Sequence, residues 1–173
     1  MATEISHEEY LGRQHKAQRL MQEMDLQALL ITDPTNLFYF TGAAYFGEMS
    51  YPRPAALRIP QKAEAMLLTH DFHLAVPWQG DVRNYPKIGA LPVDMLREML
   101  FDAGCANGKI GAELGSKRRL GISYLDYLKI QDTLPDASFV DAADIIWDIR
   151  MQKSSAEDRK KLWNKVQQVL CRH

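Results

Sequence analysis

The sequence has no long apolar run, no excess of charge of one sign and almost no cysteine. Because it has no stretch of about 18 consecutive apolar residues, no membrane span is predicted. Its 21 basic and 22 acidic residues give a formal net charge of −1, which does not indicate binding to nucleic acid or to an anionic membrane. Cys105 and Cys171 are too few for a disulfide framework and have no CxxC spacing, so reduced thiols in a cytoplasmic protein are expected.

The 173 residues have the composition of one soluble globular domain, with 46% hydrophobic and 25% charged residues. Residues 1–12 are polar and acidic and lack the charged and then apolar pattern of a signal peptide. The basic run Lys117–Arg119 is interpreted as a solvated turn.

Apolar periodicity predicts helices that alternate with short strands. A capping box at Ser6–Glu9 begins a first helix, whose apolar stripe is Tyr10, Ala17, Leu20, Met21 and Met24. The wholly apolar run 28–31 is typical of a central strand covered on both faces. Further strands are expected at 55–59, 65–68, 82–85, 109–112 and 138–140, and further helices at 72–78, 95–103, 141–151 and around Ile122, Leu125 and Leu128.

This alternation predicts the α/β class, with three layers and a sheet of about six strands between helices. The hairpin-like pair at 55–68 predicts that the sheet is mixed. The residues expected to be buried are Leu29, Leu30, Ile31, Leu67, Leu68, Ile110 and Val140.

Two distant segments carry motifs. Residues 33–42, DPTNLFYFTG, resemble the DPxN-apolar-x-Y-apolar-T-G segment of creatinases, prolidases and Xaa-Pro aminopeptidases. Residues 150–157, RMQKSSAE, resemble the RxxKSxxE junction between the two domains of that family. The resemblance implies that 1–151 is the amino-terminal domain and that 152–173 is the junction and first helix of a catalytic domain that the chain does not include. The segment at 33–42 offers no nucleophile or base in a productive pattern and is interpreted as structural.

The resemblance implies that the chemistry belongs to that second domain. There, relatives bind two divalent metals such as Mn, Co or Zn, which activate water and polarise the scissile carbonyl. Only 20 residues follow Lys153, so no catalytic residue, metal ligand or cofactor is expected in this chain. The last apolar stripe, with Leu162, Val166 and Leu170, is expected to pack on a partner or on the catalytic domain.

The loop at 45–54 is the candidate contact with substrate. In creatinase-like relatives, the corresponding stretch reaches the active site of the neighbouring subunit with an aromatic residue and, two positions on, an arginine. Phe46 matches the aromatic residue, but Glu48 stands at the arginine position, which argues against creatine as substrate. Arg53 could replace the arginine, since a guanidinium pairs with a carboxylate bidentately. The alternative is an aromatic-rich loop that packs on its own domain.

Two other groups of polar residues have weaker interpretations. His70 and His73 could share a helical face and bind a metal, although capping or flanking of a helix is favoured. Asp141, Asp144 and Asp148 could hold a hard cation, although a capping residue followed by a solvated face is favoured.

Three functional hypotheses follow. The first is an accessory, homodimeric amino-terminal domain of a metal-dependent hydrolase, which contributes to dimerisation and substrate access. The second is a standalone binding or regulatory protein derived from the same family. The third is an independent enzyme that uses His70 and His73. Proline peptides, creatine-like guanidino acids and ectoine-like amides all stay open as substrates of the parent enzyme.

Overall fold

The centre of the molecule is a mixed sheet of six strands in the order β4-β3-β2-β1-β5-β6. The computed structural model describes residues 5–43, 52–70, 78–116 and 120–151. The strands are β1 (Ala28–Ile31), β2 (Ala56–Pro60), β3 (Met66–His70), β4 (Asp81–Tyr85), β5 (Lys109–Ala112) and β6 (Ser138–Asp141). Strand β2 runs antiparallel to β1 and β3, while the other neighbouring pairs are parallel. The predicted mixed sheet is therefore confirmed.

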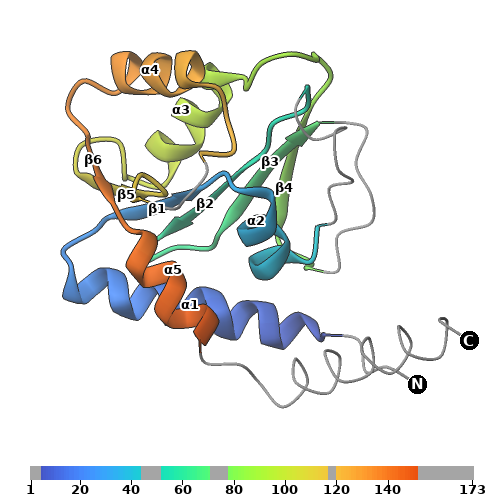
Figure 1. Ribbon diagram of the computed structural model, residues 1–173, viewed down its shortest axis with the longest axis vertical. Coiled ribbons are helices and arrows are strands. Elements are labelled where there is room, and N and C mark those ends of the chain that lie inside the picture. The colour runs from blue at the N-terminus through green and yellow to red at the C-terminus, as the bar shows by residue number, and fades with distance from the viewer. Residues whose placement is uncertain (1–4, 44–51, 71–77, 117–119, 152–173) are drawn as a thin grey trace, which may run out of the picture.

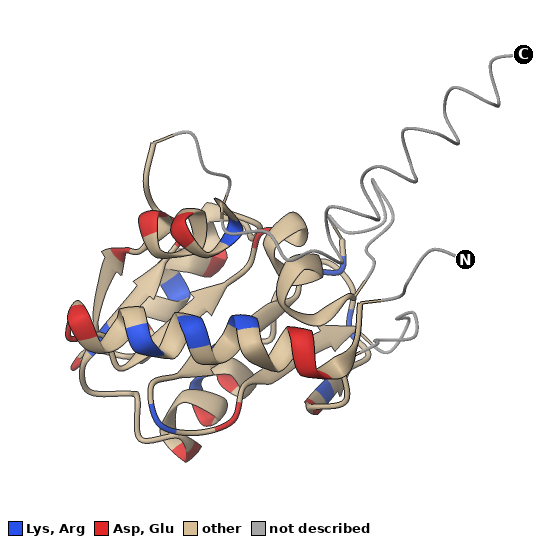
Figure 2. Ribbon diagram, turned by 90° about the horizontal axis from the view of Figure 1, so that it is seen from below, with Lys and Arg blue, Asp and Glu red and all other residues tan. Residues whose placement is uncertain are grey.

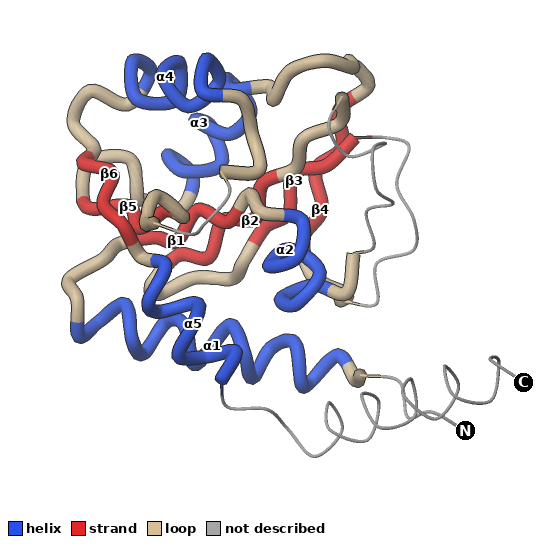
Figure 3. The backbone as a smooth tube through the Cα atoms, viewed as in Figure 1, coloured by secondary structure: helices blue, strands red, loops and turns tan. Residues whose placement is uncertain are grey.

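Helices cover both faces of the sheet, as Figures 1 and 3 show. On one face lie α1 (His7–Glu23), α2 (Pro34–Thr41) and α5 (Ala143–Met151); on the other lie α3 (Val93–Asp102) and α4 (Tyr124–Thr133). The side chains of β1 alternate between two apolar clusters. Leu29 and Ile31 pack under the first group of helices, and Ala28 and Leu30 under the second. This alternation explains the wholly apolar run and confirms three layers.

Local capping explains where α1 and α2 begin. The Ser6 hydroxyl accepts a hydrogen bond from the backbone N–H of Glu9 at 3.4 Å. The Asp33 carboxylate accepts from the N–H groups of Thr35 and Asn36, and Pro34 occupies the first helical position. Helix α2 ends at Gly42, whose φ of 72° favours a residue without a Cβ.

The prediction of burial was wrong at Val140 and at Met24. Val140 is only half-buried, because β6 is an edge strand with a neighbour on one side alone. The predicted helix around Leu125 and Leu128 is α4, which packs on the sheet side through Ile130 and leaves these two leucines exposed. Met24 is 45% exposed, since it is the C-cap of α1 and lies beyond the buried stripe.

Several predicted features lie outside the described residues. They are the helix at 72–78 apart from Trp78, the basic run Lys117–Arg119, and the segment 152–173 with its capping box and Cys171.

Charges of both signs are interspersed over the described residues (Figure 2). On α1, the basic residues Arg13, Lys16 and Arg19 lie between acidic residues at the two ends of the helix. None of the helices in the described ranges is long and apolar enough to cross a membrane.

Leu30→Ala should lower the free energy of unfolding by about 2–5 kcal/mol, because it leaves a cavity in the cluster under α3 and α4. Urea denaturation measures the change. Leu125→Ala is the matched control, because Leu125 is 67% exposed, and it should cost less than about 0.5 kcal/mol. A loss below about 1 kcal/mol for Leu30→Ala would contradict its assignment to the core.

Candidate functional site

The carboxyl ends of the parallel strands meet at one edge of the sheet. In open α/β sheets, ligands bind at this edge where neighbouring strands send the chain in opposite directions. Here β1 and β5 are such neighbours, since the chain passes from β1 to β2 on one side and from β5 to β6 on the other. The crevice between these two strand ends is therefore the candidate site.

Glu113, the residue directly after β5, fills this crevice. Its side chain is buried, with the whole residue 2% exposed. One carboxylate oxygen accepts hydrogen bonds from the backbone N–H groups of Thr32 and Asp33, both at 2.8 Å, and the other accepts from Asn36 Nδ2. Burial raises the pKa of Glu113, and these three donors oppose that shift. The carboxylate thus lies where an anionic ligand would meet the turn before α2.

The loop between β5 and α4 also closes the crevice. Gly121 donates its backbone N–H to the Thr32 hydroxyl at 3.3 Å. A Cβ at Gly121 would lie 1.8 Å from the Thr32 carbonyl oxygen, so this close approach requires glycine. The crevice is therefore occupied by the protein's own groups.

Residues of the two sequence motifs meet beside Glu113. Arg150 donates from Nη1 to Asn36 Oδ1 at 2.5 Å. Tyr39 donates its hydroxyl to the Ile149 carbonyl at 3.2 Å, and its ring centre lies 5.8 Å from the Arg150 guanidinium carbon. The motif at 33–42 therefore contacts the end of α5, where the second motif begins.

The carboxyl-terminal end of the loop at 45–54 is held by residues at the end of β4 and just after it. Gly89 donates its N–H to the Pro52 carbonyl at 2.8 Å, and the Tyr85 hydroxyl donates to the Pro54 carbonyl. Arg53, between these two anchors, is half-buried. Phe46 and Glu48 lie outside the described residues.

The predicted pair of histidines is only half described, since His73 lies outside the described ranges. His70 ends β3, is 7% exposed, and donates from Nε2 to the Pro86 carbonyl at 3.0 Å. Its ring meets that of Tyr85 edge to face, with centroids 5.4 Å apart. Among the described residues, no three His, Cys, Asp or Glu side chains gather so that they could hold a metal ion.

The three aspartates near α5 have separate positions. Asp141 accepts from the Ala143 N–H at 3.0 Å, at the start of the helix. Asp144 and Asp148 are exposed. These are the positions of a capping residue and a solvated face.

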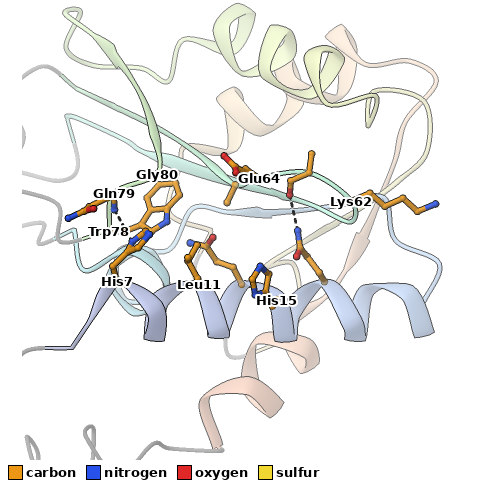
Figure 4. Close-up of a pocket in the computed structure, with 12 residues that line it drawn as sticks. His7, Leu11, His15, Lys62, Glu64, Trp78, Gln79 and Gly80 are labelled. Atoms are coloured by element: carbon orange, nitrogen blue, oxygen red, sulfur yellow. Dashed lines mark hydrogen bonds between the residues drawn. The ribbon is translucent and has the colours of Figure 1, made fainter.

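A hollow of about 440 Å³ lies between α1, the β2–β3 turn and residues 78–80 (Figure 4). His7 and His15 line it from α1, opposite Trp78. Gln79 donates its N–H to His7 Nδ1 at 3.2 Å, and Gln18 Nε2 donates to two carbonyl groups at the turn, both at 2.8 Å. These polar groups therefore tie α1 to the sheet.

Sequence reasoning missed four buried charged residues, Arg13, Arg58, Glu113 and Asp126, of which Arg58 and Glu113 lie in or next to the central strands. Arg58 donates to the carbonyl groups of Met99 and Glu64, and burial lowers its pKa. It thereby satisfies a carbonyl in the last turn of α3. Two observations could have indicated Arg58 and Glu113: Arg58 is the one charge in an apolar strand, and Glu113 is the first residue after a predicted strand. Cys105 is a free thiol, and burial raises its pKa.

Comparison with known proteins identifies relatives of this fold. The family model described as "Creatinase/Prolidase N-terminal domain" matches residues 13–152. A dipeptidase from Pyrococcus horikoshii OT3 is 26% identical with a TM-score of 0.65, over 84% of this chain and 38% of that one. A search of curated proteins gave no match.

Two further structures share the fold. The Xaa-Pro dipeptidase from Bacillus anthracis is 15% identical with a TM-score of 0.65, over 87% of this chain and 38% of that one. The N-terminal domain of Xaa-Pro dipeptidase from Lactobacillus brevis is 15% identical with a TM-score of 0.61, over 79% of this chain and 98% of that one. The chain thus spans 38% of the length of the first two enzymes and nearly all of the isolated domain.

Glu113→Gln should change how stability depends on pH. Because the folded pKa of Glu113 is raised above its ordinary value of 4.5, its contribution is fully present below pH 4.5 and is lost as pH rises through the raised pKa. The free energy of unfolding of the natural chain, minus that of the variant, should therefore fall as pH rises. Urea denaturation of both proteins from about pH 4 to about pH 7 measures this difference. If the difference in free energy of unfolding instead grows with pH, the hydrogen-bond donors around Glu113 have a larger effect on its pKa than burial has.

Proposed function

The chain belongs to the creatinase/prolidase N-terminal domain family, and on this basis we propose that it is the non-catalytic amino-terminal domain of an Xaa-Pro peptidase or creatinase-type hydrolase. The observation that carries this proposal is the extent of the match. The chain corresponds to 38% of whole dipeptidases but to 98% of a structure that is an N-terminal domain alone. A likeness confined to that domain favours an accessory role.

The proposed contribution is to dimerisation and to substrate access through the loop at 45–54. The carboxyl-terminal base of the loop is held at the strand edge, by Gly89 at Pro52 and by Tyr85 at Pro54. Arg53 and the aromatic residues of the loop are of the types enriched at protein interfaces. Phe46, Glu48 and Arg53 are therefore proposed as the residues that meet the neighbouring subunit or its substrate.

The chemistry is proposed to belong to a catalytic domain that follows residue 151. Two divalent metals, Mn, Co or Zn, would there activate water and polarise the scissile carbonyl. The described residues of this chain offer no comparable cluster of ligands, so no catalytic step is assigned to them. One structural relative is the N-terminal domain of a cytoplasmic peptidase from Mycobacterium tuberculosis H37Rv, and a cytoplasmic location is proposed here too.

The chain should form a dimer at micromolar concentration, and Phe46→Ala should weaken it. Truncation of a central anchor residue of an interface costs more than about 1 kcal/mol, so a roughly fivefold or larger rise in the dimer dissociation constant is expected. Sedimentation equilibrium measures it. Phe101→Ala is the matched control, since Phe101 is 51% exposed on α3. A monomer at all concentrations would contradict the proposed role in dimerisation.

The purified chain should hydrolyse neither Xaa-Pro peptides nor creatine when Mn²⁺, Co²⁺ or Zn²⁺ is added. A two-metal site needs several carboxylates and an imidazole in one cavity, and the histidine pair supplies two ligands at most. Release of amino acid or urea is the measurement. Turnover that disappears when His70 and His73 are both replaced by Asn would overturn the accessory role and establish an independent enzyme.

A further inference from the structure

The amide of Asn36 connects a buried anion to a cation at the end of the domain. Its Nδ2 donates to Glu113, and its Oδ1 accepts from Arg150. The two contacts fix the orientation of the amide, since a carboxylate can only accept and a guanidinium can only donate. Asn36 itself is 2% exposed, so neither contact can be replaced by bulk water without exposing buried groups.

The anion is rigidly held on the sheet side of this connection. Glu113 follows β5 directly and binds the two N–H groups that follow β1. Strands β1 and β5 are hydrogen-bonded neighbours in the centre of the sheet. The charge of Glu113 therefore has a position fixed by the most buried part of the fold.

The cation lies on the last turn of the last described helix. Arg150 precedes Met151, where α5 ends. The neighbouring Ile149 carbonyl accepts from Tyr39, which also comes from α2. Both contacts join α2 to the end of α5, which lies along α1 in Figure 1. The end of α5 is thus attached by polar contacts at two successive residues, in addition to its apolar face.

We propose that Arg150, acting through Asn36 and Glu113, is a positioning residue that fixes the end of α5 to the carboxyl edge of the sheet. The connection sets the place and direction at which the polypeptide leaves the domain. This inference rests on the proposed function, in which a catalytic domain follows residue 151. The orientation of that catalytic domain relative to the first domain would then depend on Arg150.

Only an amide at position 36 suits both of its neighbours, Glu113 and Arg150. Aspartate would place a second carboxylate beside Glu113, and an apolar residue would leave Glu113 and Arg150 each short of a partner. An amide alone, among uncharged side chains of this length, donates on one side and accepts on the other.

A double substitution provides a specific test. Asn36→Asp alone should repel Glu113 and loosen the end of α5. In the double variant N36D/E113Q, position 36 carries the carboxylate and position 113 carries the amide. The amide introduced by E113Q could then accept from the backbone and donate to the carboxylate introduced by N36D, which would pair directly with Arg150.

The measurement is hydrogen–deuterium exchange of the amides at 147–151 in the full chain. Arg150→Ala and Asn36→Asp should each speed exchange at least about tenfold, the effect of losing one hydrogen bond to a charged group. The double variant should return to within about threefold of the natural chain. Asp148→Ala, at an exposed position of the same helix, is the control and should leave exchange unchanged.

Two results would overturn the proposal: unchanged exchange in Arg150→Ala, or a double variant that is no better protected than Asn36→Asp. If Asn36→Asp does not fold, recovery of folding in the double variant gives the same support as recovered protection. Exchange requires neither substrate nor a second copy. A monomeric or enzymatically active chain would therefore overturn the proposed function without altering this result.

Discussion

The buried negative charge of Glu113 is the constraint on which the carboxyl edge of the sheet depends. A carboxylate away from water is costly unless hydrogen-bond donors surround it. Two of its donors are backbone groups, so the charge determines where β1 ends and where the turn to α2 begins. The third donor is Asn36, whose amide oxygen accepts a hydrogen bond from Arg150 and so connects Glu113 to α5.

Local patterns were sufficient for the elements of the fold, because burial on both faces of a strand leaves a wholly apolar run such as 28–31. They were insufficient where position in the sheet decides burial, as at Val140 on the edge strand. The motifs indicated that Asn36 and Arg150 matter, but not that they touch. They lie 114 positions apart, and no local pattern encodes a contact that is oriented by a third residue, Glu113.

The same edge of the sheet supports the proposed accessory role. In many α/β proteins this crevice receives a ligand, whereas here Glu113 and the close approach of Gly121 to Thr32 occupy it. His70 and Tyr85, at the ends of β3 and β4, are used to hold neighbouring backbone. The polar groups at this end therefore stabilise loops and helix ends, and they hold the backbone at Pro52 and Pro54.

The order of strands has a consequence for synthesis on the ribosome. Strand β2 can pair with β1 and β3 as soon as these residues emerge, because they are close in sequence. The other edge of β1 pairs with β5, whose residue Gly111 lies opposite Leu29. Until then, the central strand of the nascent chain has one open edge. The amino-terminal half is thus a template for unwanted strand pairing during much of its translation, and β5 is the segment that ends this vulnerability.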